Sequence, residues 1–412
     1  MLARLYLSGR LFSVACLLAG ALYLWFLGRK LAGDSGGALA GLIYALSPGV
    51  LIQAHLMKQY LVWTLWSLAC FHASLLLLED GSRKRYLAAG AAAGLAAGTF
   101  TLSVWTCLLP AAAALLRLFG GGSWRKEARG LCAAALAAAA GFFLVNPYWL
   151  SNLAEVRAEL AVEKGAMLFS ISPVWRFLSG QLRLALSWPF ELAALAGLAM
   201  ALRSEDRRHN LLGAAFILSL LPIFYSAAAF QTRGIRYCMA SVGFGGLLAA
   251  FAWLRLRPEG VRGRRIHAAL AAAALLHLAL CAATVSNNFA ASTGAGSTNR
   301  LAGLWIEENV KSGESVGLWI LPRPENSPYF RLDKISITLL DQREAEELAD
   351  DKLPRWIVVW QPATNLKPEM ERVLSRYEKA RSFEPPSIVP WIRLVHGETT
   401  ANPVFDVYRK KV

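Results

Sequence analysis

Two short loops carry the cations that are best placed to bind a phosphate group. Arg236 stands beside Tyr237 at the edge of an apolar block, with Arg233 three residues earlier, and Lys58 and His55 share another such loop. An arginine can hold two phosphate oxygens at once, whereas a lysine binds as a point charge. The competing interpretation is structural, because Arg and Tyr favour the membrane interface and a loop lysine can extend its charge into water.

Four glutamates could act as a general base. Glu155, Glu159 and Glu163 recur every four residues and therefore share one face of a helix, a pattern that is typical of an amphipathic helix on a membrane surface. Glu191 follows Trp188-Pro189-Phe190 near the end of an apolar block, where a carboxylate is costly and often functional. All four are catalytic candidates, and none is assigned as the base.

The residue pattern does not support metal or disulfide chemistry. The six cysteines lie in apolar blocks without metal-ligand spacing, and His72, His267 and His277 also lack partners at such a spacing. We expect no cofactor and no metal. The net charge of +15 does not indicate nucleic-acid binding, because Lys and Arg cluster in short loops between apolar blocks.

The apolar blocks predict an integral membrane protein. Hydrophobic residues make up 56% of the 412, and only 17% are charged, against about a quarter in soluble domains. Many blocks approach the roughly 20 residues that span a bilayer. We expect a polytopic helical domain over residues 1–289, with about ten crossings, and a soluble domain over 290–412. The crossings are expected near residues 9–28, 36–54, 60–78, 86–100, 102–119, 129–146, 184–202, 210–229, 237–254 and 266–286.

Loop charges predict the side that each loop faces. Alternate loops are rich in Arg and Lys, which places them in the cytoplasm, at residues 29–30, 83–85, 125–129, 203–208 and 255–265. The external side then holds the loops at 55–59 and 230–236, an amphipathic segment at 147–183 and the C-terminal domain. Met1 is also placed outside, although residues 1–10 contain no signal peptide, so we expect a further helix upstream.

Residues 290–412 alternate helical and strand-like patterns, which predicts a small α/β domain. Helices are expected at 299–310, 343–350 and 367–377, and strands at 315–321, 335–340, 356–360 and 404–408. Gly313 is expected to follow the end of the first helix. The domain has neither a Gly-rich phosphate loop nor a nucleophile elbow, so we assign it no chemistry.

An ordered series of short stretches runs through most of the chain. The series comprises Leu2-Ala3-Arg4, Gly28-Arg29-Lys30-Leu31-Ala32-Gly33, Ala45-Leu46-Ser47-Pro48, Ala89-Gly90, Gly94-Leu95-Ala96-Ala97-Gly98-Thr99, Asn146-Pro147-Tyr148, Arg236-Tyr237, Asn299-Arg300-Leu301-Ala302, Trp305-Ile306-Glu307-Glu308-Asn309, Gly313-Glu314-Ser315-Val316, Asn402-Pro403 and Val407-Tyr408-Arg409. No single stretch is specific. In this order, and with the derived topology, they resemble the GT-C superfamily of membrane glycosyltransferases, in the branch of protein mannosyltransferases and lipid A aminoarabinose transferases (glycosyltransferase family 39).

The resemblance implies an enzyme of the bacterial inner (plasma) membrane with its C-terminal domain on the periplasmic or extracellular side. Such enzymes move a sugar from a polyprenyl-phosphate-linked donor to an acceptor lipid, glycan or protein at the external face, usually with inversion. The resemblance also implies that the donor phosphate binds at Arg236 and Tyr237, with Lys58, Arg233 and His55 as further candidates for phosphate binding. In these proteins an acidic residue in the first external loop acts as general base.

The sequence departs from the family where this acid is expected. The chain begins at the stretch that follows the first helix and its acidic loop, so it resembles a member that lacks the first helix. The next external loop, residues 55–60, contains no acid, and Phe100 stands where a Lys commonly follows Thr99. The missing acids keep a second function open, a non-catalytic relative that binds lipid-linked glycan or scaffolds partners.

A transporter is the third possible function. Its crossings would be expected to carry ionisable residues and an internal repeat, and this chain has few of the former and no obvious example of the latter.

Overall fold

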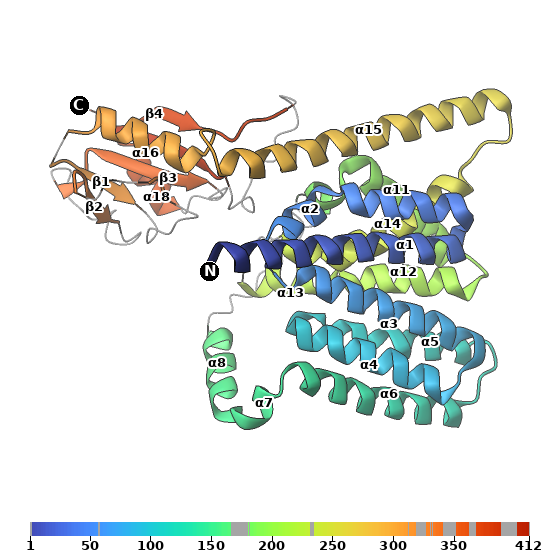
Figure 1. Cartoon of the computed structure of the whole chain (residues 1–412). Helices are drawn as coiled ribbons and strands as arrows, with labels where there is room; N and C mark the ends of the chain where they lie inside the picture. Colours follow the sequence, from blue (N-terminus) through green and yellow to red (C-terminus); the bar gives the residue numbers. More distant parts are fainter. Residues whose placement is uncertain are drawn as a thin grey trace. The chain divides into compact units, whose positions relative to one another are not determined.

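The computed structural model of the chain, shown in Figure 1, describes residues 2–56, 58–165, 180, 182–230, 235–311, 313–318, 327–329, 331, 333–340, 352–361, 368–388 and 402–411. The chain divides into two compact units, Met1–Ala279 and Leu280–Val412. The division falls inside one long helix, α15 (Val261–Ser292).

The N-terminal unit is built from helices. They are α1 (Leu2–Leu46), α2 (Pro48–His55), α3 (Tyr60–Asp80), α4 (Arg83–Thr99), the 3-10 helix η1 (Thr101–Cys107), α5 (Leu108–Leu118), α6 (Trp124–Val145), α7 (Tyr148–Ser151), α8 (Leu153–Gly165), α10 (Arg183–Leu186), α11 (Trp188–Leu202), α12 (Arg207–Ser219), α13 (Leu221–Phe230), the 3-10 helix η3 (Ile235–Cys238), α14 (Met239–Arg255) and the first part of α15. In the described part of the chain, 7 helical stretches are long and apolar enough to cross a membrane. A mostly helical membrane domain is therefore confirmed, whereas the ten crossings stay a prediction.

The first helix bends back on itself at Ala32-Gly33, where the backbone leaves the helical conformation. A Cβ atom added to Gly37 would lie 2.4 Å from the carbonyl oxygen of Trp25, and one on Gly41 would lie 3.0 Å from that of Ala21. The segments on either side of the bend therefore pack against each other in opposite directions. They correspond to the first two expected crossings, the second of which continues into α2.

Small residues allow α4 and α6 to pack backbone against backbone. Gly90, Gly94 and Gly98 recur every four residues on the face of α4 that meets α6. Cβ atoms added to Gly90 and Gly94 would lie 2.1 and 2.0 Å from the carbonyl oxygens of Ala134 and Ala138. Because apolar surfaces gain little from association in lipid, such close contact between small residues is a main source of helix pairing there.

A buried polar cluster joins the start of α4 to three other helix ends. The Tyr86 hydroxyl donates a hydrogen bond to the carboxylate of Glu127, which is fully buried. Arg117 Nε donates to the same carboxylate at 3.1 Å, and its Nη1 donates to the carbonyl oxygens of Leu77 and Leu78 at 3.3 and 3.1 Å. The cluster therefore fixes the ends of α3 and α5 against the starts of α4 and α6.

The arginine-rich loops gather at this same end of the N-terminal unit. The Arg117 guanidinium lies over Gly81, and a Cβ atom on Gly120 would meet the Arg207 guanidinium at 1.9 Å. Two residues after Arg207, in the first turn of α12, His209 Nε2 lies 3.3 Å from the carbonyl oxygen of Leu31. The loops around residues 31, 81, 120 and 207 thus form one surface, here called the arginine-rich end. That this end faces the cytoplasm stays a prediction.

The described residues of the C-terminal unit form a five-stranded mixed sheet. Its elements after α15 are α16 (Thr298–Asn309), β1 (Ser315–Leu318), β2 (Ser336–Leu339), β3 (Trp356–Gln361), α18 (Pro368–Leu374), β4 (Tyr377–Phe383) and β5 (Val404–Lys410). The strand order is β2-β1-β3-β5-β4. β1 pairs in parallel with β2 and β3, and β5 pairs antiparallel with β3 and β4.

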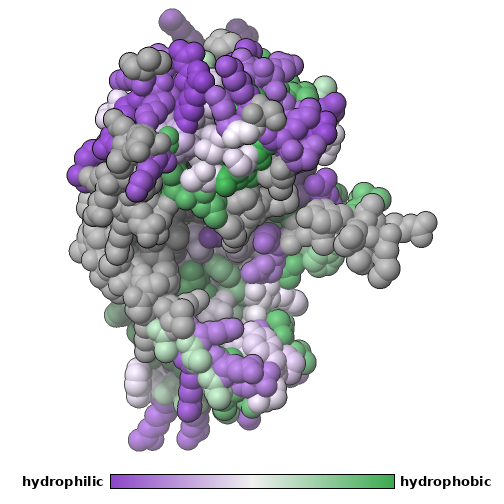
Figure 2. All heavy atoms as spheres, turned by 90° about the vertical axis from the view of Figure 1, so that its left-hand side faces the viewer, coloured by the Kyte–Doolittle hydropathy of each residue, from purple (hydrophilic) through white to green (hydrophobic). Residues whose placement is uncertain are grey.

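Both faces of this sheet are covered. Ile306 of α16 packs with Val358 of β3 on one face, whereas Val373 of α18 packs with Ile357 on the other. Alternate residues of β3 therefore point to two apolar cores, as the continuous apolar run predicted. Where its residues are described, the face of this unit in Figure 2 is largely hydrophilic.

The expected α/β domain is confirmed, with one correction. The helix expected at 367–377 ends at Leu374, and Tyr377 begins the strand β4 instead. Sequence periodicity did not reveal β4, because its five central residues are all exposed and several are charged, as is common for a strand at the edge of a sheet. The expected helix at 343–350 and the end of the expected strand at 315–321 lie outside the described residues.

Gly94→Leu should lower the melting temperature of the detergent-solubilised protein. Its side chain would collide with the Ala138 carbonyl group, and overpacking of this kind costs roughly 1–3 kcal/mol. Gly260→Ala is the control, because an added Cβ atom there has no neighbour within 4 Å. Equal melting temperatures for the two variants would contradict close packing of α4 on α6.

Candidate functional site

Four aromatic rings meet where α4 ends, at the opposite end of α3 and α4 from the buried Glu127 cluster. The Phe100 ring lies 5.4 Å from that of Tyr60, 4.9 Å from that of Trp63 and 6.0 Å from that of Tyr237, measured between ring centres. The rings come from the start of α3, the turn after α4 and the turn η3. We call this region the Phe100 end.

Arg236 lies on η3 and is positioned by its sequence neighbour. Its guanidinium carbon is 4.9 Å from the centre of the Tyr237 ring, and its Nη2 donates a hydrogen bond of 3.2 Å to the Tyr237 hydroxyl. A cation over an aromatic face is attracted to the electrons of the ring. Because Phe100 supports the same ring, the direction of the half-buried Arg236 is set by packing.

The other predicted phosphate-binding residues differ in their placement. His55 is the last residue of α2, which packs against η3, and its Nδ1 lies 2.8 Å from the carbonyl oxygen of Leu51. Lys58 is exposed in the turn between α2 and α3. The structure therefore brings the helix of His55 against the turn of Arg236. Arg233 lies outside the described residues.

Glu191 lies near the same region, in the first turn of α11. Its carboxylate accepts a long hydrogen bond of 3.5 Å from Arg183 Nε of α10, a helix that packs against both α2 and η3. Only 13% of the Glu191 side chain is exposed. Ser187, the residue just before α11, has a φ angle of 72°, which is strained for a residue other than glycine, and its hydroxyl lies 2.9 Å from His277 Nδ1.

The remaining glutamate candidates are on α8. Glu155 and Glu159 are both exposed, which fits the helix on a membrane surface that their spacing suggested. The side chain of Glu163 lies outside the described residues. Of the candidate bases, Glu191 is therefore the one that the described contacts connect to the Phe100 end.

The described residues contain no group of three or more His, Cys, Asp and Glu that could hold a metal ion. All six cysteines are free. Among the described residues, the Phe100 end brings together a cation, aromatic rings, an imidazole and a carboxylate.

Phe100 and Trp63 were not predicted to belong to the site. A signal for Phe100 was present in the sequence, because an aromatic residue stands where the resemblance described above leads us to expect a Lys. Its partners could not be identified, since residues 60, 63, 100 and 237 come together only through the packing of α3, α4 and η3.

Comparison with known proteins supports the resemblance seen in the sequence. Residues 4–150 match the family of dolichyl-phosphate-mannose-protein mannosyltransferases, a stretch that includes His55, Lys58 and Phe100 but not Arg236 or Glu191. No curated protein matches significantly. Among solved structures, arabinofuranosyltransferase AftD from mycobacteria is similar with a TM-score of 0.44 and 15% identity, over 98% of this chain and 35% of AftD. Over residues 4–150 the chain is thus similar to the mannosyltransferase family named above, which confirms the predicted resemblance to membrane glycosyltransferases of the GT-C type.

Proposed function

We propose that this protein transfers a sugar from a polyprenyl-phosphate-linked donor to an acceptor lipid, glycan or protein, and that the donor phosphate binds at the Phe100 end. The observation that carries the proposal is the Arg236 guanidinium, held over the Tyr237 ring on a turn that packs against α2. The family match over residues 4–150 supports a glycosyltransferase. The external side and the bacterial inner membrane are part of the proposal.

The proposed reaction replaces one bond to the anomeric carbon of the sugar by another. The acceptor oxygen bonds to this carbon while the bond from the carbon to the phosphate oxygen breaks. The hydroxyl proton passes to a base, and the electron pair of the broken bond leaves with the polyprenyl phosphate. An arginine that contacts two phosphate oxygens stabilises the charge that develops there. We assign this role to Arg236, with inversion at the anomeric carbon.

Glu191 is the base that we propose. It is mostly shielded from solvent and is joined through Arg183 to α10, which contacts both η3 and α2. A base must come within hydrogen-bond reach of the acceptor hydroxyl. The acceptor would therefore enter between α11 and the turn that carries Arg236.

A second function is favoured by the turn between α2 and α3. It presents Lys58, with His55 just before it, but no carboxylate, and Phe100 occupies the position of a common family Lys. A protein that binds the lipid-linked sugar without transferring it would need the cation and the aromatic rings but no base. The two functions share the binding step and differ in the transfer step.

Arg236→Ala should weaken the binding of a polyprenyl phosphate to the protein in nanodiscs by roughly tenfold to a hundredfold, because hydrogen bonds to charged groups contribute about 1.5–3 kcal/mol. Arg236→Lys should restore part of the loss. Arg255→Ala is the matched control. Arg255 also lies over an aromatic ring, that of Phe251, but it is the last residue of α14 and is not part of η3. Equal affinities for the Arg236→Ala and Arg255→Ala variants would contradict the proposed phosphate site.

Glu191→Gln should reduce sugar transfer from a radiolabelled polyprenyl-phosphate sugar by about 10²–10⁴-fold, the usual contribution of a general base. Donor binding should change little, since the variant keeps the shape of the side chain. Glu155→Gln and Glu159→Gln are controls that should retain transfer. Wild-type transfer by Glu191→Gln would exclude it as the base, whereas donor binding without any transfer by the wild-type protein would support the non-catalytic function.

A further inference from the structure

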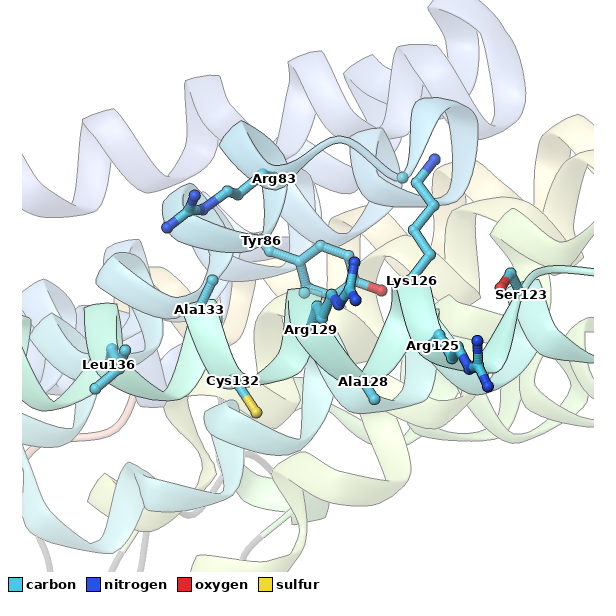
Figure 3. A pocket seen from close by; sticks show the side chains of 12 residues that line it. Arg83, Tyr86, Ser123, Arg125, Lys126, Ala128, Arg129, Cys132, Ala133 and Leu136 are labelled. Carbon is cyan, nitrogen blue, oxygen red and sulfur yellow. The ribbon is translucent and has the colours of Figure 1, made fainter.

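A pocket with a volume of about 750 Å³ lies at the arginine-rich end, between the starts of α4 and α6 (Figure 3). Arg83 of α4 borders it, together with Arg125, Lys126 and Arg129 from the first two turns of α6. Figure 3 shows the Tyr86 ring among these cations. None of these residues has a part in the function proposed above.

Two of the acids beside this surface already have partners. Glu127 is buried and paired with Arg117 at 3.1 Å, and Asp80 is paired with Arg85 at 3.5 Å. Within the described part of the chain, none of the four bordering cations is part of an ion pair. Four positive charges therefore border one pocket, and a bound anion would reduce the repulsion between them.

The wall of the pocket continues into an apolar surface. Leu136 lines the pocket and is 74% exposed, and two turns further along α6 Leu144 is 77% exposed. α6 is one of the helices long and apolar enough to cross a membrane, and it meets α4 through Gly130, Ala134, Ala138 and Gly141. The bulky exposed residues therefore face outward, where acyl chains would lie.

We propose that this surface binds an anionic phospholipid, with its phosphate among the cations of α4 and α6 and an acyl chain along Leu136. Basic pockets between transmembrane helices are suited to such head groups, and each Lys or Arg near an anionic membrane contributes about 1 kcal/mol. A free phosphate would match the cations but not the apolar wall. The bound lipid also relieves the repulsion between the starts of α4 and α6, and so stabilises this helix pair.

The test titrates the purified full-length protein with phosphatidylglycerol and, separately, with phosphatidylcholine, and counts bound lipids by native mass spectrometry. The triple variant Arg125→Gln, Lys126→Gln and Arg129→Gln removes three pocket charges. The matched control Arg262→Gln, Arg264→Gln and Arg265→Gln removes three charges from the start of α15. We expect the pocket variant to bind phosphatidylglycerol roughly tenfold more weakly or worse, and the control to bind it like the wild type.

Two results would overturn the proposal. One is equal phosphatidylglycerol binding by the pocket variant and the control. The other is displacement of the lipid by an equal concentration of glycerol phosphate, which would indicate a site for a free anion. Arg129→Gln alone provides a second variant if the triple variant does not fold, and it should weaken phosphatidylglycerol binding in the same direction without changing the weak binding of phosphatidylcholine.

Discussion

The backbones of α4 and α6 approach so closely that a single methyl group at Gly90 or Gly94 would collide with a carbonyl oxygen. Polar contacts hold the pair at its two ends. At one end the buried Glu127 carboxylate joins α6 to Tyr86 of α4, and at the other Asn146 Nδ2 donates a hydrogen bond of 2.7 Å to the carbonyl oxygen of Gly98. In hydrocarbon an unsatisfied polar group costs several kcal/mol, so both contacts strongly favour one placement of α4.

This placement determines where the chain turns at Phe100, and hence what surrounds Arg236. The Phe100 ring lies against Tyr60, Trp63 and Tyr237, and the Tyr237 ring supports the guanidinium. These ring contacts help to hold the short helix η3 against α2 and α14. The two ends of α4 consequently differ in chemistry: one gathers arginines around a buried carboxylate, and the other presents one oriented cation among aromatic rings.

The elements with strong periodicity or long apolar runs could be predicted from the sequence, and so could the pairing of Arg236 with Tyr237, which are neighbours in the chain. The aromatic cluster could not, because residues 60, 100 and 237 share no local pattern. One of the family-like stretches has a structural role. Asn402 accepts hydrogen bonds of 2.8 Å from both the backbone N–H and the hydroxyl of Thr298, and so caps α16. This cap joins residues about a hundred positions apart, so local sequence patterns could not predict it.

The central claim is that the donor phosphate binds to Arg236 at the Phe100 end. Cryo-electron microscopy of the protein in nanodiscs that contain a polyprenyl-phosphate sugar tests it most directly. The account predicts density for the phosphate within hydrogen-bond distance of the Arg236 guanidinium, with the sugar between η3 and the start of α11. Density for the polyprenyl-phosphate head group at the arginine-rich end, with none beside Arg236, would contradict it.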